Sequence, residues 1–458
     1  MKKLLLFLTC LMTSAIVYSQ IMFEKTYGGA DYDNGSSVIQ INDGSYIILG
    51  STESYGAGDY DIYLLKTNPY GDTLWTRTFG GVGKEYGYDV IQNIDGGFTI
   101  LGMINYDVGI IKTDVNGLPI WTKTIGGPMT ESGNNFSQTY DGGYIIVGNT
   151  ASYGAGDFDM YVIRTNSTGD TLWTKTFGGA YEDFGCSITQ TNDSGFVIVG
   201  IKVFYPAGPG NIALLKMDKN GNILWTRYYS GSGTYWASSV SKTNDGGYII
   251  SGHTSGLYLI KTNANGDSIW TKTYGKGIGG DGISVIQTSD NGYLAAGRCS
   301  NLNTGDDDAF IIKTDANGDS LWANTFGNGF RTTFTSLALT NDGGYIFTGY
   351  QEVSHEGPYD VYLVKTDANG IVGLKEESIN INNVNIYPNP ATNKITIYIP
   401  QQFGQTKILE VYDCIGQLQL LQTDRFTEID ISNLTNGLYF LVLTNTDNER
   451  QTMKIIKN

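Results

Sequence analysis

Residues 121–176 carry one full copy of the pattern that decides the fold: Trp121-Thr-Lys-Thr, then Asp141-Gly-Gly-Tyr, then Arg164-Thr-Asn, and again Trp173-Thr-Lys-Thr. Each mark occurs seven times along the chain. The aromatic residues are Phe23, Trp75, Trp121, Trp173, Trp225, Trp270 and Trp322; the turn acids are Asp43, Asp95, Asp141, Asp193, Asp245, Asp290 and Asp342; the basic residues are Lys66, Lys112, Arg164, Lys216, Lys261, Lys313 and Lys365. A period of 45–52 residues is typical of a propeller or a solenoid.

Each repeat predicts four β-strands, which we name A to D in chain order. In the third repeat they are expected at 136–139, 144–148, 159–165 and 172–177, with Gly, Asp and Asn in the turns between them. Strand B is an unbroken apolar run, as expected for a strand that is covered on both faces. Four-stranded sheets stacked around an axis satisfy this pattern.

The two ends of the repeat are out of phase. The first element is a lone D strand at 22–27, and the last repeat stops after strand C. An open solenoid gains nothing from this offset. In a ring, the N-terminal strand completes the seventh sheet and removes its unpaired edge. The sequence therefore predicts an all-β fold, a seven-bladed β-propeller over residues 20–372 that is closed by its N-terminal strand.

The aromatic residue that opens strand D is expected to lie between neighbouring blades. The stretch Asp315-Ala-Asn-Gly-Asp-Ser-Leu-Trp322 resembles the tryptophan-docking repeat of the quinoprotein (PQQ-type) propellers. That resemblance implies the fold and not the redox chemistry, since the sequence has neither an adjacent cysteine pair nor a clear quinone or calcium signature.

Length varies in one place, the connection between strands B and C. The interval from the turn acid to the basic residue is 23 residues in five repeats, 17 in the second and 16 in the fifth. The B–C and D–A connections share one face of a propeller, and variable loops on a fixed scaffold are where binding usually occurs. The residues predicted to face a ligand there are Asp31, Asp33, Tyr55, Asp59, Asp61, Glu85, Tyr153, Asp157, Asp159, Glu182, Asp183 and Trp236.

Aromatic rings among carboxylates favour a non-catalytic role in recognition of, or adhesion to, a glycan or a protein. The alternatives are a polysaccharide-acting hydrolase or lyase, and a purely structural surface protein whose loop acids are only solvated. No catalytic residue, metal ligand or cofactor is predicted. Ca²⁺ binding stays an open alternative, because the same loop acids offer the oxygen ligands that this ion takes. Two acids and an aromatic residue in one deep axial pocket would favour the enzyme.

The N-terminus predicts export. Residues 1–19 have the charged start, apolar run and small-residue cleavage site of a secretory signal peptide. The net charge of −16 becomes −18 once Lys2 and Lys3 are removed with it. Such a negative protein is not expected to bind nucleic acid, and no other stretch of the sequence is expected to span a membrane.

A polar linker at 373–384 leads to residues 385–458, whose short strands predict a small β-sandwich. This segment contains Tyr387-Pro-Asn-Pro, Tyr412-Asp-Cys-Ile-Gly, Leu434-Thr-Asn-Gly-Leu-Tyr and a Lys-rich end. Together these motifs resemble the type A C-terminal sorting domain of the Bacteroidetes type IX secretion system. The resemblance implies the secretion machinery as a partner, a secreted or outer cell-surface location, and as sorting-motif residues Pro388, Asn389, Pro390, Gly416, Gly437, Tyr439 and Lys454.

Overall fold

The computed structural model of the 458-residue chain describes residues 21–205, 210–230, 235–275, 280–300, 306–327, 329–355, 357–372, 384–389, 391–400, 403, 405–413, 417–424, 426–446 and 450–457. The predicted signal peptide, nearly all of the predicted linker, Pro390 and Gly416 lie outside these residues. The chain divides into two compact units, Met1–Gly373 and Leu374–Asn458. In the described ranges, no helix has the length and apolar character needed to cross a membrane.

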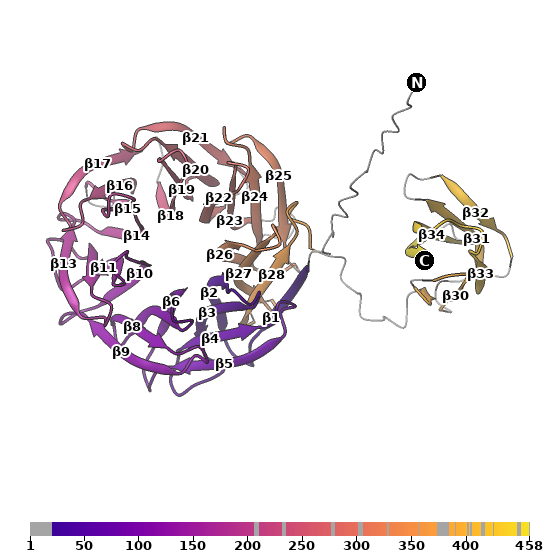
Figure 1. The fold of residues 1–458 in the computed structure, drawn as a ribbon, viewed down its shortest axis with the longest axis horizontal. Helices are drawn as coiled ribbons and strands as arrows, with labels where there is room; N and C mark the ends of the chain where they lie inside the picture. Colours follow the sequence, from indigo (N-terminus) through magenta and orange to yellow (C-terminus); the bar gives the residue numbers. More distant parts are fainter. Residues whose placement is uncertain are drawn as a thin grey trace, which may run out of the picture. The chain divides into compact units, whose positions relative to one another are not determined.

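The strands described in the first unit form seven four-stranded antiparallel sheets around an axis (Figure 1). Blades 1 to 3 comprise β2 (Asp33–Gln40), β3 (Tyr46–Thr52), β4 (Asp61–Thr67) and β5 (Thr73–Phe79); β6 (Tyr86–Gln92), β7 (Phe98–Ile104), β8 (Asp107–Thr113) and β9 (Pro119–Ile125); β10 (Glu131–Gln138), β11 (Tyr144–Thr150), β12 (Asp159–Thr165) and β13 (Thr171–Phe177). Blades 4 to 6 comprise β14 (Asp183–Gln190), β15 (Phe196–Lys202), β16 (Asn211–Met217) and β17 (Ile223–Tyr229); β18 (Trp236–Lys242), β19 (Tyr248–His253), β20 (Leu257–Thr262) and β21 (Ser268–Tyr274); β22 (Asp281–Gln287), β23 (Tyr293–Ser300), β24 (Asp307–Thr314) and β25 (Ser320–Phe326).

Blade 7 is assembled from both ends of the propeller. It contains β26 (Thr332–Leu339), β27 (Tyr345–Glu352) and β28 (Tyr359–Thr366), and its outer strand is β1 (Phe23–Tyr27). The pairing runs from Phe23 opposite Lys365 to Tyr27 opposite Val361. In Figure 1 the indigo β1 accordingly lies beside the orange β28. The predicted ring and its closing strand are confirmed.

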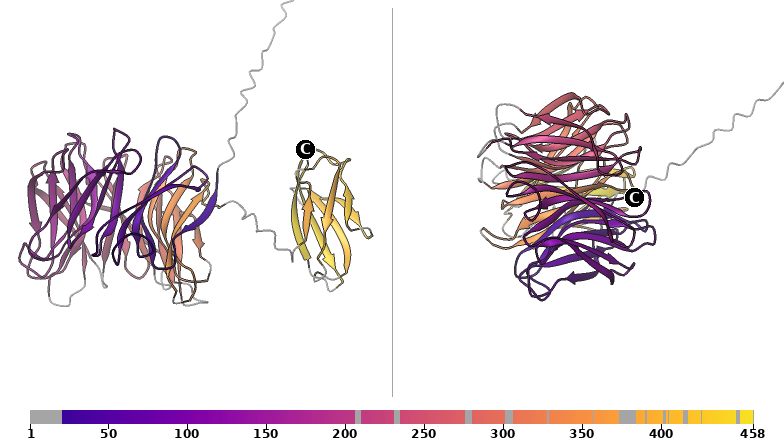
Figure 2. Two further views of the ribbon diagram at one scale, coloured as in Figure 1. Left: turned by 90° about the horizontal axis from the view of Figure 1, so that it is seen from below. Right: turned by 90° about the vertical axis from the view of Figure 1, so that its left-hand side faces the viewer.

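Burial follows the position of a strand within its blade. The A strands surround the axis and the D strands form the outer rim (Figure 1). Strand B of blade 1, β3, is buried at all seven positions, whereas the D strand β5 is exposed at alternate positions. The blades stack as a thick disc (Figure 2). We call the face with the B–C and D–A connections the loop face, and the opposite one the turn face.

Each outer aromatic residue contacts a glycine of the next blade, on the C–D turn. A Cβ built on Gly117 would lie 2.8 Å from the Trp75 ring, and one built on Gly318 would lie 2.9 Å from the Trp270 ring. These glycines have φ angles of 75° and 78°, which a side chain would strain. The same contact is made by every copy, with the pairs Phe23–Gly71, Trp75–Gly117, Trp121–Gly169, Trp173–Gly221, Trp225–Gly266, Trp270–Gly318 and Trp322–Gly370.

The other two marks of the repeat meet within each blade. The basic residue of strand C forms an ion pair with the turn acid between strands A and B, with an N–O distance of 2.5–3.2 Å in all seven copies. The cationic side chain is the more buried partner, and the side chain of Lys365 is only 1% exposed. The ion pair therefore explains why these residue types recur at a fixed place in the fold.

The second unit is a small β-sandwich, as predicted. One sheet has β29 (Asn385–Tyr387), β30 (Lys394–Tyr398) and β33 (Glu428–Asp430), and the other has β32 (Leu418–Gln422), β31 (Thr406–Asp413), β34 (Gly437–Asn445) and β35 (Arg450–Lys457). Alternate residues of both sheets, such as Ile395, Leu409 and Leu441, form one buried apolar core.

Candidate functional site

The A strands line a narrow polar pocket on the axis. Each of them contains a β-bulge at equivalent positions, for example between Gly35 and Ser37 in β2 and between Gly87 and Asp89 in β6. The pocket has a volume of about 190 Å³. Its lining residues are Ser36, Ser37, Tyr88, Asp89, Asn134, Asn135, Cys186, Ser187, Ser238, Ser239, Ile283, Ser284, Thr335 and Ser336.

Asp89 is the single carboxylate in this lining, as far as the structure describes it. Burial raises its pKa to about 6, although Ser37 Oγ donates to Oδ1 at 2.8 Å and Asn135 Nδ2 donates to Oδ2 at 2.8 Å. These bonds join three neighbouring blades. Glycoside hydrolysis commonly needs two carboxylates at roughly 5–10 Å, and the described axial lining does not supply such a pair.

Five of the acids predicted to face a ligand are buried instead, namely Asp33, Asp61, Glu85, Asp159 and Asp183. Each binds its own loops. Asp61 Oδ2, for example, accepts hydrogen bonds from the amides of Ala57 and Gly58 at 2.8 and 3.0 Å. Asp33 Oδ2 accepts from the Gly29 amide and Ser54 Oγ. These side chains therefore shape the loop face but do not lie on its surface.

The other predicted loop residues are exposed but scattered. Asp31, Asp59, Asp157 and Glu182 lie at the surface of separate connections. Tyr55 and Tyr153 are equivalent residues of blades 1 and 3. Each is 44% exposed and donates its hydroxyl to a D–A carbonyl, Gly28 O at 2.7 Å and Gly126 O at 3.1 Å respectively. Both tyrosines thus tie a B–C loop to the preceding connection.

The structure gathers five other tyrosines around a pocket of about 360 Å³ on the loop face of blades 7, 1 and 2. Its lining comprises Tyr32, Tyr60, Tyr86, Tyr350 and Tyr359, together with Asp33 and Asn34. We call it the tyrosine pocket. The ring centroids of Tyr32 and Tyr359 are 5.2 Å apart, and those of Tyr60 and Tyr86 are 5.0 Å apart. Burial raises the pKa of Tyr60 and of Tyr86, so both hydroxyls stay protonated at neutral pH.

Three acids that the sequence predicted to face a ligand are the chain neighbours of these tyrosines. Asp33 follows Tyr32, Asp61 follows Tyr60 and Glu85 precedes Tyr86. Successive side chains of a strand point to opposite sides, so the acid turns into the blade and the adjacent ring turns out. The signal that could have found the pocket is therefore the acid–tyrosine dipeptide at the start of a strand.

Trp236 begins strand A of blade 5 and is 39% exposed. Its ring is nearly parallel to that of His253, with centroids 6.1 Å apart. His253 Nδ1 lies 3.2 Å from Asp281 Oδ1, and Asp281 also receives the Arg298 guanidinium at 2.5 Å. Burial lowers the pKa of His253, with Asp281 opposing and Arg298 reinforcing this effect. Trp236 is thus partly exposed, and its ring stacks on those of His253 and Phe184.

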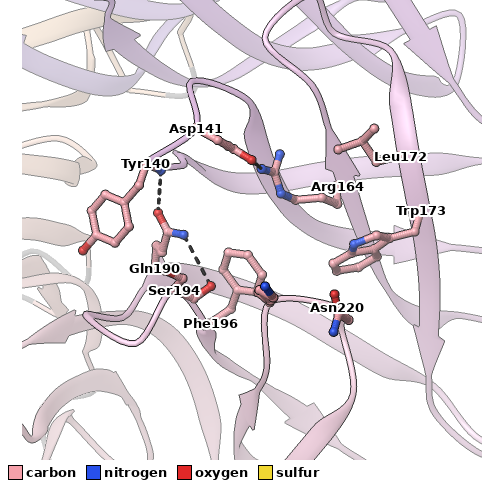
Figure 3. Close-up of a pocket in the computed structure, with 10 residues that line it drawn as sticks. Tyr140, Asp141, Arg164, Leu172, Trp173, Gln190, Ser194, Phe196 and Asn220 are labelled. Carbon is pink, nitrogen blue, oxygen red and sulfur yellow. Dashed lines mark hydrogen bonds and ion pairs between the residues drawn. The ribbon is translucent and has the colours of Figure 1, made fainter.

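Figure 3 shows a larger depression, of about 440 Å³, at the seam of blades 3 and 4 on the turn face. Arg164 closes it on one side and donates to both carboxylate oxygens of Asp141 at 2.5 and 2.6 Å. Trp173 on the other side is the outer aromatic that contacts Gly221. Because its chief residues are those that join blades and strands, we assign this depression to the scaffold.

Two of the residues predicted for the sorting motif, Asn389 and Tyr439, make hydrogen bonds within the second unit. Asn389 donates to Lys454 O at 2.7 Å and accepts from the Ile456 amide at 2.8 Å, and thereby pairs with the edge of β35. Tyr439 is buried and donates its hydroxyl to Thr435 O at 2.8 Å. Pro388 and Lys454 are exposed and Gly437 starts β34.

Residues 385–458 match the family of secretion system C-terminal sorting domains. They are a type IX secretion sorting domain. A chain that carries this sorting domain is secreted or displayed on the outer cell surface, and the domain implies engagement of the type IX secretion machinery. No curated protein matches the sequence significantly.

Several solved structures are similar to this chain at low identity. Raptor of Chaetomium thermophilum has a TM-score of 0.51 at 10% identity, over 75% of this chain and 29% of that one. PorZ, a surface component of the type IX secretion system of Porphyromonas gingivalis, has a TM-score of 0.43 at 10% identity. The match covers 94% of this chain and 60% of PorZ. The Pan2 WD40 domain of Neurospora crassa has a TM-score of 0.46 at 10% identity, over 78% of this chain and 98% of that one.

Proposed function

We propose that this protein is a non-catalytic surface recognition protein that binds a glycan in the tyrosine pocket. The observation that carries the proposal is the convergence of five tyrosines from three blades on one concave site. Sugar rings present apolar faces that stack on aromatic rings, and the phenol hydroxyls and Asn34 offer partners for sugar hydroxyls. Adhesion to a glycan-bearing surface would follow, in keeping with export by a secretion system typical of the Bacteroidetes.

The most direct test is a glycan array probed with the purified chain from residue 20, followed by calorimetry on any glycan that binds. Tyr32→Ala and Tyr359→Ala should each weaken binding about tenfold or more, because both rings line the pocket. Tyr140→Ala is the matched control, since Tyr140 is 66% exposed but lies on the turn face. Equal loss in all three variants would contradict the proposal.

The same samples test the enzyme alternative. Polysaccharides that bind should be recovered intact after long incubation with the wild-type protein. The appearance of new reducing ends or unsaturated sugars would show a hydrolase or a lyase. In that case Asp89→Asn is the first variant to assay, since its carboxyl is the one acid described in the axial lining.

A further inference from the structure

The seam between blades 7 and 1 holds two carboxylates beside Gly28. A Cβ built on Gly28 would clash with Asp360 Oδ1 and would lie 2.7 Å from Asp33 Oδ2. Asp33 is fully buried, and neither Asp33 Oδ1 nor Asp360 Oδ1 has a hydrogen-bond partner among the described residues. Burial and the nearby charge of Asp33 raise the pKa of Asp360. Asp360 is half-buried. Two acids this close, one buried and one half-buried, are costly unless a positive charge or a proton compensates them.

The seam between blades 3 and 4 has the same arrangement. Asp159 and Asp183 begin β12 and β14 and are both buried. A Cβ built on Gly178 would clash with Asp159 Oδ1 and lie 3.0 Å from Asp183 Oδ2. Here the chain supplies its own cation, because Lys202 Nζ lies 2.5 Å from Asp183 Oδ2. The positive charge is therefore built into this seam.

Blade 1 lacks that lysine. Lys202 is the residue that pairs with Asp183 across β14 and β15, and the residue that pairs with Asp33 across β2 and β3 is Thr52. Thr52 is neutral, and its hydroxyl accepts the amides of Ser54 and Tyr55. The pair formed by Asp33 and Asp360 thus has a neutral neighbour where its counterpart has an ammonium group.

We propose that Asp33 and Asp360 bind one Ca²⁺ ion in the seam between blades 7 and 1. Carboxylates are the hard oxygen ligands that Ca²⁺ prefers, and backbone carbonyls and water would complete its six to eight positions. Tyr32 and Tyr359 precede the two ligands in the chain, and their rings are in contact. The ion would therefore fix one wall of the tyrosine pocket, although the site itself does not depend on glycan binding.

Two measurements on the chain from residue 20 test the site without any glycan. After treatment with EDTA, adding CaCl₂ should raise the Tm by about 2–5 °C at saturation, since the ion binds only the folded chain. Tb³⁺, a luminescent substitute for Ca²⁺, should emit on excitation of the nearby tyrosines and should be displaced by CaCl₂. MgCl₂ at the same concentration should do neither, because Mg²⁺ demands a smaller octahedral site.

Asp360→Asn should abolish both the Tm rise and the displaceable Tb³⁺ emission. Asp157→Asn, which removes an exposed acid from the loop face, should leave both unchanged. Lys202→Met should add one Ca²⁺ per chain relative to the wild type, because it leaves Asp159 and Asp183 without their ammonium group. This gain also tests the inference if Asp360→Asn does not fold.

Three results would overturn the inference. A wild-type Tm that does not respond to CaCl₂, combined with a higher Tm for Asp360→Asn at pH 7, would show that the two carboxyls share a proton. A full CaCl₂ response in Asp360→Asn would place the ion elsewhere. A Lys202→Met chain that binds no more Ca²⁺ than the wild type would show that paired acids at a seam do not select this ion.

Discussion

The turn face and outer rim of the propeller repeat the same contacts seven times, whereas the residues of the loop face differ between most blades. On the rim, each outer aromatic contacts a turn glycine, and within each blade the strand C cation pairs with the turn acid. On the loop face, the residue that precedes the β-bulge glycine or alanine of strand A is Asn34 in blade 1, Tyr86 in blade 2, Phe184 in blade 4 and Trp236 in blade 5. Stability demands uniformity at the seams, and the loop face is free to diversify for binding.

Removing residues 20–27 should have the largest effect on the uniform side. Their loss removes β1 and leaves β28 as an open edge, at a cost of several kcal/mol, given roughly 1 kcal/mol net per hydrogen bond. Urea unfolding followed by tryptophan fluorescence measures the change. A chain without residues 385–458 is the control and should keep the wild-type midpoint. An unchanged midpoint in the first variant would mean that ring closure contributes little.

Asp342→Asn should destabilise the protein by about 3 kcal/mol, because it leaves the buried Lys365 ammonium without its carboxylate. The same change at Asp43 should cost about 1 kcal/mol or less, since its partner Lys66 is 15% exposed. Urea titrations of both variants measure the difference. Equal costs would show that burial of the cation does not set the strength of this repeated pair.

Trp270→Ala should cost about 2 kcal/mol, because the half-buried ring packs on Gly318 and contacts Tyr293 edge-on with centroids 5.7 Å apart. Gly318→Ala should cost about 1 kcal/mol through its positive φ and its contact with the same ring. Ile269→Ala, at an exposed position beside Trp270, is the control and should change the unfolding free energy by less than about 0.5 kcal/mol.

Acid should weaken the turn pairs below pH 4. Burial raises the pKa of Asp193, Asp245 and Asp290, but hydrogen bonds from their lysine, threonine and amide partners outweigh it and lower each pKa to about 2. An unfolded Asp has a pKa of about 3.9, so the stability from these pairs is present above that value and lost as pH falls toward 2. Urea unfolding midpoints measured from pH 5 to pH 2 test this. The midpoint of Asp290→Asn should fall less steeply with decreasing pH than that of the wild type, because one of these pairs is already absent. Asp89 has the opposite effect, because its pKa is raised to about 6. Its contribution to stability decreases as the pH rises from about 4 to about 6.

Asp59→Asn should have the smallest effect on stability, within about 0.5 kcal/mol. Asp59 is an exposed loop acid whose pairing with Lys84 is long, at 3.9 Å. Urea titrations of Asp59→Asn and Asp342→Asn compare the stability cost of losing one acid from the loop face with that of losing one from the turn face. A cost above 1 kcal/mol for Asp59→Asn would show that the loop face also contributes to the stability of the ring.

The fold was predictable because its signals repeat. Seven copies of the aromatic residue, the turn acid and the basic residue, with a lone strand at the start, predict a closed ring, and β1 pairs with β28 as that ring requires. The ion pair between two of these marks was not predicted, although both residues had been identified. Their separation of 16–23 residues gives no hint of contact until strands A to C are placed side by side.

For the candidate site, the sequence indicated only the face on which to look. The tyrosine pocket lies on the predicted face, yet its lining includes Tyr32, Tyr60 and Tyr86, and of the acids beside them only Asp33. Sequence order places both residue types in the same loops, and one residue of register decides which reaches the surface. Tyr350 and Tyr359 come from blade 7, so only ring closure brings them to Tyr32.

Closure at blade 7 also determines how the propeller bears mechanical load. The chain leaves the ring from β28, and a pull from the attached sorting domain would act on that strand first. β28 is held by β27 on one side and by β1 on the other. An edge strand can be peeled off one hydrogen-bonded pair at a time, but this strand must lose two neighbours together. A propeller closed in this way resists peeling at the strand that leads to the sorting domain.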